Sequence, residues 1–201
     1  MPAEEPINTD LVRDFWNPIY AFLRADGRNH DEASAGLCRF FQAWNDNHTV
    51  PRLRTSVLAK LTTLNPSEFE GTDSATEYDL EWCRRRFDSW PEIVGPTQLF
   101  DCEWADVLVQ KCMHKVELEY VRRGRAKEFR ILSRTVRGRQ IPPRELAHML
   151  KQSGSEAQRA LQQLRHRLRL AFSAQVAETA VEGEFDTELQ HVSALAPGVF
   201  Q

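Results

Sequence analysis

The sequence predicts an all-α fold of two small helical domains joined by a flexible linker. Apolar residues recur every three or four positions along several stretches, which is the periodicity of amphipathic helices. Between these stretches lies a segment rich in Ser, Thr, Gly and Pro, with eight acidic residues. With 201 residues, the chain can form one domain or two small ones. We expect a helical domain over residues 8–64, a linker over 65–98, a second helical domain over 99–181 and an acidic tail over 182–201.

The N-terminal domain is predicted to contain three short helices. Residues 11–23 form an apolar stripe, which Pro18 should kink or divide because proline lacks a backbone N–H. Gly27 can end this element, a second helix follows over residues 33–44, and a third spans 52–64. Two interpretations of the many aromatic residues stay open: they form one tight core, or they leave an exposed patch for a protein partner. These residues are Phe15, Trp16, Tyr20, Phe22, Phe40, Phe41 and Trp44.

The strongest helical pattern covers residues 99–120. Its apolar residues repeat every four positions and predict one buried stripe. They are Phe100, Trp104, Leu108, Cys112, Val116 and Tyr120. Within the expected linker, residues 77–87 are the part most suited to a helix, and a short helix is also possible at 186–190 in the acidic tail.

Residues 145–169 predict a helix-turn-helix arrangement, in which two helices are joined by a tight turn. The first helix follows Pro142 and Pro143, and proline is well tolerated at a helix start. Ser153 precedes Glu156 by three residues, the capping-box spacing that marks a second helix start. This helix can continue as far as Thr179. Its apolar stripe consists of Ala157, Ala160, Leu161, Leu164 and Leu168.

The opposite face of this second helix is rich in Gln and Arg. These side chains make paired hydrogen bonds to adenine and guanine edges in the major groove, so the face predicts DNA recognition. An alternative is a solvated helix pair within an ordinary helical domain. The candidate DNA-binding residues on this face are Gln158, Arg159, Gln162, Gln163, Arg165, His166 and Arg169.

The net charge of −3 conceals a strong split along the chain. Residues 121–170 hold 14 Lys and Arg against 3 Asp and Glu, a balance of +11, which leaves −14 for all other residues. A basic block between acidic segments favours a module that faces nucleic acid, attached to a part that faces protein.

Other classes of function find no support in the sequence. No glycine-rich phosphate loop, His-Glu-x-x-His motif or nucleophile elbow is present, so we expect a non-enzyme without a cofactor. The four cysteines are scattered, which argues against a disulfide framework or a metal site. No apolar run suits a membrane span and the N-terminus lacks a signal pattern, so we expect a cytoplasmic protein.

The C-terminal half resembles region four of bacterial RNA polymerase sigma factors of the extracytoplasmic-function type. The matching residues are Glu145, Leu146, Ala147, Leu150, Ser153, Ala160, Leu161, Leu164, Arg165, Arg167, Leu168 and Arg169. The family usually has Gly in the turn, where this chain has Lys151 followed by Gln152. If that position is left-handed, a side chain with a Cβ strains the turn.

The N-terminal half is similar to region two of the same family, the domain that holds the polymerase and melts promoter DNA. The matching residues are Leu11, Val12, Trp16, Pro18, Tyr20, Ala21, Arg24, Gly27, Ala33, Phe40, Phe41, Arg52, Arg54, Leu58 and Ala59. The resemblance implies DNA contacts by Arg52 and Arg54 and polymerase contacts by Leu37, Phe40 and Phe41.

Two functions follow as expectations from this resemblance. One is a sigma factor that recruits core RNA polymerase to promoter DNA and is held by an anti-sigma or other inhibitory protein. The other is a divergent sigma-like subunit that acts mainly through protein–protein contacts with an inhibitor or adaptor. The family's acidic-Leu-x-Gln signature on the polymerase-binding helix reads Ala35-Gly36-Leu37-Cys38 here, which favours the second function.

Overall fold

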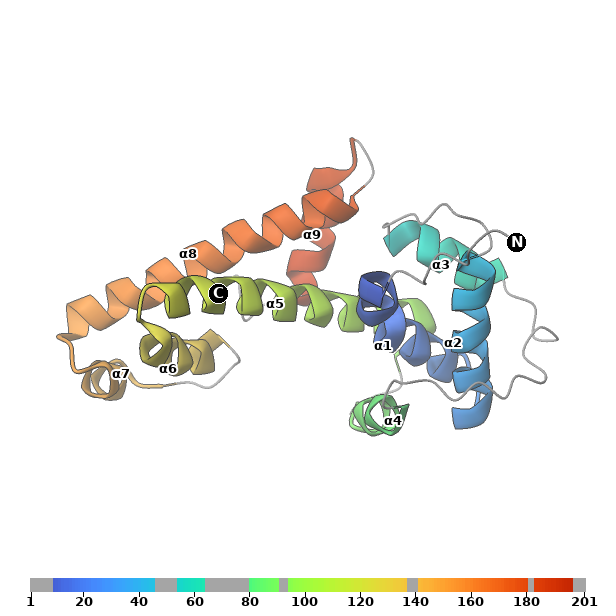
Figure 1. The fold of residues 1–201 in the computed structure, drawn as a ribbon, viewed down its shortest axis with the longest axis horizontal. Coiled ribbons are helices and arrows are strands. Elements are labelled where there is room, and N and C mark those ends of the chain that lie inside the picture. The colour runs from blue at the N-terminus through green and yellow to red at the C-terminus, as the bar shows by residue number, and fades with distance from the viewer. Residues whose placement is uncertain are drawn as a thin grey trace, which may run out of the picture. The chain divides into compact units, whose positions relative to one another are not determined.

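The expected all-α fold class is confirmed for the residues that the structure describes. The structure, a computed structural model, describes residues 9–45, 54–63, 80–90, 94–136, 141–180 and 183–196. Every regular element in these ranges is a helix (Figure 1). Among them, no helix combines the length and the apolar character that crossing a bilayer requires.

The chain divides into two compact units. Unit 1 is Met1–Trp104 and unit 2 is Ala105–Gln201. The division falls inside one long helix, α5 (Pro96–Arg122), a little beyond the expected domain start at residue 99. All six residues of the predicted α5 stripe are buried, the first two in unit 1 and the other four in unit 2.

The described residues of unit 1 form four further helices, which are α1 (Thr9–Ala25), α2 (His30–Asn45), α3 (Arg54–Thr63) and α4 (Leu80–Asp88). Pro18 does not divide α1, which runs through it as one helix. Its neighbours Ile19 and Tyr20 are fully buried, so packing offsets the backbone hydrogen bond that proline cannot make. Gly27 ends α1 with a positive φ of 93°, as the sequence suggests.

The aromatic residues of unit 1 form its core. Phe15 stacks on Trp104 with ring centroids 4.4 Å apart, and Trp16 stacks on Phe41 at 6.0 Å. Each predicted aromatic whose side chain is described is at most 6% exposed, whereas the Trp44 side chain lies outside the described set. The tight-core interpretation is therefore correct for these residues, and the exposed aromatic patch is not present among them.

Part of the expected linker packs into unit 1. Helix α4 lies against α1 and buries Cys83. The carboxylate of Glu103, only 2% exposed, anchors this region. It accepts hydrogen bonds from Arg86 Nε at 3.0 Å, from Trp90 Nε1 at 2.7 Å and from the Asn17 amide. One buried acid thus joins α1, α4 and α5.

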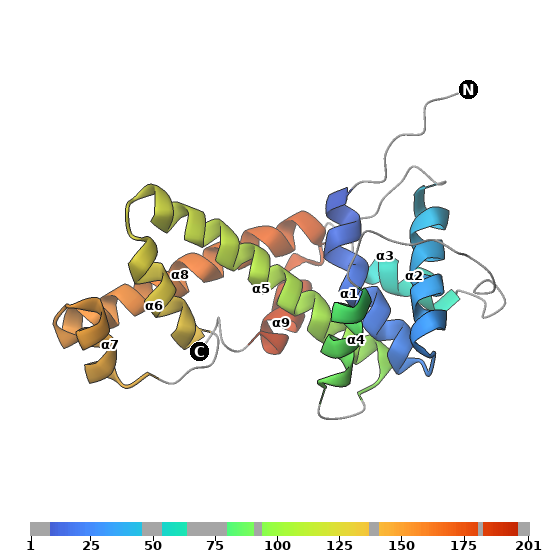
Figure 2. The same ribbon diagram turned by 60° about the horizontal axis from the view of Figure 1, so that its bottom comes forward.

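Unit 2 consists of the second part of α5 with α6 (Ala126–Val136), α7 (Pro143–Leu150), α8 (Gly154–Thr179) and α9 (Phe185–Leu195). Helix α7 packs on α8, and α6 contacts both. Helix α9, from the acidic tail, packs on α8 near its C-terminal end (Figures 1 and 2). Every residue of the predicted α8 stripe is buried, which confirms the periodicity argument for this helix.

Candidate nucleic-acid interface

The start of α8 is fixed by a complete capping box. The Ser153 hydroxyl accepts the backbone N–H of Glu156 at 3.3 Å, and Glu156 Oε2 accepts the backbone N–H of Ser153 at 2.9 Å. The Ser153 hydroxyl also donates to Glu156 Oε2 at 2.7 Å. This hydrogen bond, together with the one from the Ser153 backbone N–H, holds the pKa of the Glu156 carboxyl below its usual value. The predicted helix start is confirmed, and a carboxylate lies at the positive end of the helix dipole.

The turn before α8 has the geometry of a Schellman motif. Lys151 lies in the left-handed region, with φ 55° and ψ 43°. The Gln152 N–H donates to the Ala147 carbonyl at 3.0 Å, and the Lys151 N–H donates to the His148 carbonyl at 3.1 Å. Among the described non-glycine residues, only Lys151 has a positive φ. The left-handed conformation considered from the sequence is therefore the observed one.

The predicted base-reading residues are brought together along one face of α8. Their helical spacing places them opposite the buried stripe. Six are exposed, and Arg165 is partly buried. The exposed six are Gln158, Arg159, Gln162, Gln163, His166 and Arg169. A polar face of about three turns, rich in Gln and Arg, can make hydrogen bonds to base edges in a major groove.

A cluster of charged and aromatic groups holds α8 against α5. Arg167 Nη1 lies 3.0 Å from Glu119 Oε2. The guanidinium groups of Arg167 and Arg125 lie 5.6 and 5.3 Å from the centroid of the Tyr120 ring. Burial raises the pKa of the Tyr120 hydroxyl above its ordinary value. Sequence reasoning missed this cluster, because Glu119 and Arg167 are 48 positions apart.

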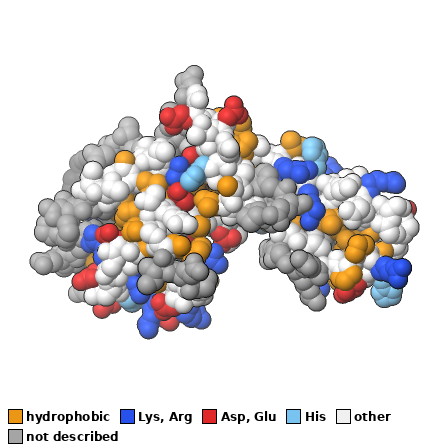
Figure 3. All heavy atoms as spheres, turned by 180° about the vertical axis from the view of Figure 1, so that it is seen from behind, with side chains coloured by type: hydrophobic (Ala, Val, Ile, Leu, Met, Phe, Trp, Pro, Cys, Tyr) orange, Lys and Arg blue, Asp and Glu red, His pale blue; other side chains and the backbone are white. Residues whose placement is uncertain are grey.

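The basic charge of unit 2 lies largely at its surface. Exposed Lys and Arg side chains occur on α5, α6 and α7 as well as on α8. In the right-hand part of Figure 3, which shows the α6–α8 end of unit 2, Lys and Arg predominate over Asp and Glu. Such a surface attracts the phosphate backbone without regard to base sequence. Examples are Arg122, Arg123, Lys127, Arg130, Arg134 and Arg144.

The two arginines expected to contact DNA from unit 1 have different outcomes. Arg52 lies outside the described residues. Arg54 Nη1 lies 2.7 Å from Asp101 Oδ1, and the two side chains are only 13% and 7% exposed. The guanidinium of Arg54 is therefore engaged inside unit 1, where it joins α3 to α5.

The three residues expected to contact polymerase belong to the unit 1 core. Leu37 and Phe40 are fully buried, and Phe41 is 5% exposed. The Phe40 ring also lies 5.7 Å from the Lys60 ammonium. All three lie on the apolar side of α2, and their side chains pack in the core of unit 1. Their side chains do not form an accessible surface in this conformation.

Neither a metal site among the described residues nor a match to a known protein adds to this description of the site. Within the described parts of the chain, no group of three or more His, Cys, Asp and Glu residues could hold a metal ion. Comparisons of the chain with protein-family models, with curated proteins and with solved structures found no match.

Proposed function

We propose that this protein is a DNA-binding transcription initiation factor of the sigma type. Unit 2 reads promoter DNA through the exposed face of α8, and unit 1 contributes to the recruitment of bacterial core RNA polymerase. The exposed Gln/Arg face of α8, opposite a fully buried stripe, carries this proposal. The polymerase part of the proposal rests on the resemblance of residues 11–64 and 99–181 to sigma factors.

Three features of unit 2 support the DNA-reading part. The capping box and the left-handed turn define where α8 starts, so its first turns have a fixed orientation relative to α7. The Glu119–Arg167 ion pair and Tyr120 hold α8 on α5. The surrounding basic residues supply attraction for phosphates, which positions a protein on DNA but does not select a sequence.

The test is a selection of DNA from a randomised pool, with the full chain alone and with the chain bound to bacterial core RNA polymerase. Enrichment of a defined sequence, followed by transcription from it only when the chain is present, supports the proposal. The Arg159→Ala and Gln162→Ala variants should lose the enrichment first. If neither sample enriches any sequence, DNA reading by α8 is wrong.

The alternative function is a sigma-like subunit that acts mainly through an inhibitor or adaptor protein. The altered segment from Ala35 to Cys38 and the burial of Leu37, Phe40 and Phe41 favour it. Co-purification from the native host, followed by competition with core polymerase, distinguishes the two. Recovery with a different protein that core polymerase cannot displace favours the alternative, and recovery with polymerase favours the sigma function.

A further inference from the structure

We propose that the pocket between α6 and α7 binds a small carboxylate that has a short apolar body. The pocket has a volume of about 270 Å³, close to the lower end of the roughly 300–1,000 Å³ usual for ligand pockets. This site goes beyond the proposed function, because it requires a small molecule and does not depend on DNA reading by α8.

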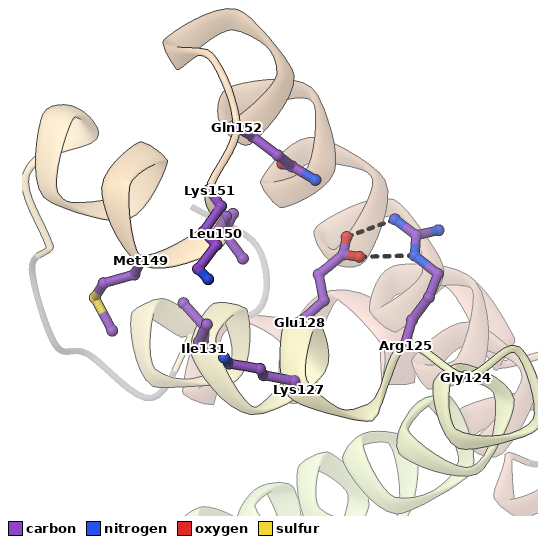
Figure 4. Close-up of a pocket in the computed structure, with 9 residues that line it drawn as sticks. All are labelled: Gly124, Arg125, Lys127, Glu128, Ile131, Met149, Leu150, Lys151 and Gln152. Atoms are coloured by element: carbon purple, nitrogen blue, oxygen red, sulfur yellow. Dashed lines mark hydrogen bonds and ion pairs between the residues drawn. The ribbon is translucent and has the colours of Figure 1, made fainter.

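One wall of the pocket is apolar. Ile131 of α6 and Met149 and Leu150 of α7 line it, and Figure 4 shows Ile131 and Met149 on the same side of the space. Ile131 is 9% exposed, so it forms a fixed floor, whereas Met149 and Leu150 are partly exposed. Methionine adapts its shape to irregular apolar groups, so this wall can accept a small hydrocarbon or aromatic body.

The rim of the pocket carries positive charge. Lys127 and Lys151 line it, both exposed, and neither ammonium has an ion-pair partner within the described residues. Arg125 and Glu128 also line the pocket, but they bind each other through two hydrogen bonds (Figure 4). In one of them, Arg125 Nε donates to Glu128 Oε2 at 2.7 Å. Since Arg125 neutralises Glu128, the two lysines determine the charge that an incoming ligand meets.

The conformation of Lys151 is a second, independent observation at this pocket. Three helices in the described residues end with the same pair of backbone hydrogen bonds, after α1, α5 and α7. Gly27 and Gly124 occupy the left-handed position in the first two, with φ of 93° and 70°, and Lys151 occupies it in the third. A left-handed residue with a Cβ costs roughly 1 kcal/mol or more relative to glycine. At the position that lines the pocket, the chain therefore has a strained lysine where glycine would be relaxed.

These features together select the class of ligand. Two ammonium groups favour an anion, and the apolar wall favours a hydrocarbon or aromatic body attached to it. A phosphodiester or a free phosphate satisfies the charge but leaves the apolar wall in contact with water. A neutral apolar molecule covers the wall but leaves the lysines without a partner. A carboxylate joined to a small apolar body satisfies both, and it would also touch the turn before α8.

Methyl NMR of the full chain, labelled at its methionine methyl groups, tests this site directly. The chain has three methionines, of which Met149 lines the pocket and Met113 is 4% exposed inside unit 2. Sodium benzoate, benzyl alcohol and inorganic phosphate serve as the three probes. We expect benzoate to shift the Met149 signal in a saturable manner and to leave Met113 unchanged. At equal concentrations, benzyl alcohol and phosphate should cause much smaller shifts.

A double variant assigns the charge requirement. Lys127→Gln with Lys151→Gln should weaken benzoate binding about fivefold or more, since each exposed ion pair contributes modestly. Lys115→Gln, an exposed lysine of α5 away from the pocket, is the matched control and should bind benzoate as the parent does. An unchanged Met113 signal shows that each variant keeps the fold of unit 2.

Several results would overturn the proposal. A Met149 shift that never saturates would mean that no site exists. Equal shifts with benzyl alcohol would mean that the lysines play no part, and equal shifts with phosphate would mean that the apolar wall plays none. Unchanged benzoate binding in the double variant would also exclude the proposed rim.

Discussion

Unit 1 and unit 2 both bury apolar stripes of their helices. Their predicted contact residues differ in position: those of unit 1 lie on a stripe, and those of unit 2 lie away from one. In unit 1, Leu37, Phe40 and Phe41 lie on the stripe of α2, and the fold buries them. In unit 2, the Gln and Arg residues lie off the stripe of α8, and the fold exposes all but Arg165. Helical periodicity therefore separates the two sets: the candidates on an apolar stripe are buried, and those away from a stripe stay largely accessible.

The two units also differ in where they keep their polar groups. Unit 1 buries the Glu103 carboxylate among three donors and the Arg54–Asp101 pair nearby in the same unit. Unit 2 holds Arg167 and Glu119 at its partly exposed surface, with side chains 29% and 39% exposed. Buried charges are sensitive to the loss of a partner, whereas exposed ones are not. The difference predicts that unit 1 is the more easily broken by a single polar substitution.

The largest expected effect is therefore at Glu103. Glu103→Ala removes the acceptor that Arg86, Trp90 and Asn17 share, and it should destabilise unit 1 by about 3 kcal/mol. This value is at the lower end of the usual range for breaking a buried ion pair, because the Arg86 side chain is about a third exposed. All five tryptophans lie in unit 1, so tryptophan fluorescence during urea unfolding reports on this unit. Glu117→Ala, at an exposed position of α5 in unit 2, is the control and should leave the fluorescence midpoint unchanged. Equal midpoints for the two variants would contradict the anchoring role of Glu103.

The next largest effect is on DNA affinity, and it tests the exposed Gln and Arg residues of α8. Arg159→Ala or Gln162→Ala should cost about 1–3 kcal/mol of binding free energy on a selected sequence and relax selectivity at one base pair. Arg122→Ala or Arg123→Ala should weaken binding evenly on selected and random DNA, because phosphates carry no sequence information. Salt-controlled titrations on both DNAs measure the difference. Identical behaviour of the two pairs would show that α8 does not read bases.

Much of the fold followed from local patterns in the sequence. The α5 stripe, the α8 stripe and the Ser153–Glu156 capping box each depend on residues within one or two helical turns, and all are observed. These features were predictable because the interactions that produce them are short in sequence.

The features that could not be predicted depend on contacts between distant residues. The Asn17–Glu103 hydrogen bond joins residues 86 positions apart, and Arg54–Asp101 joins residues 47 apart. The second pair places the guanidinium of Arg54, an expected DNA contact, in a largely buried ion pair, and no local pattern signals that partner. Pro18 is similar, because its tolerance inside α1 depends on the packing of its neighbours. The pocket was also missed, since α6 and α7 form it only after they pack.

The buried Cys112 thiol in the interior of unit 2 should make the unfolding free energy depend on pH. Burial raises the pKa of the Cys112 thiol to about 12, from an ordinary value of 9.0. The folded state therefore keeps this proton while the unfolded state releases it. The contribution to stability is complete below pH 9 and decreases as the pH rises from 9 toward 12, by up to about 1.4 kcal/mol per pH unit.

The comparison of the parent with Cys112→Ala isolates this effect from other groups that titrate in the same range. The difference in unfolding free energy should stay constant between about pH 7 and 8.5 and shrink above pH 9. Circular dichroism follows the whole chain, and tryptophan fluorescence in parallel identifies the part due to unit 1. A difference that stays constant up to pH 10.5 would show that Cys112 ionises without cost.

The smallest expected effect is at the turn after α7, where a lysine occupies the left-handed position that glycine occupies after α1 and α5. Gly27 ends α1 in unit 1 without strain, whereas Lys151 ends α7 in unit 2 with a Cβ in the left-handed region. Lys151→Gly should relieve that strain, while the greater freedom of glycine in the unfolded chain offsets part of the gain. The net effect should be a stabilisation of unit 2 by about 1 kcal/mol or less, measured by thermal unfolding followed by circular dichroism. Lys115→Gln is the control for the loss of one positive charge.

The same Lys151→Gly variant should bind benzoate less tightly, because it removes one of the two ammonium groups at the pocket rim. Higher stability together with weaker binding would indicate that the lysine is kept for its side chain, and a lower midpoint would show that the left-handed turn needs no relief.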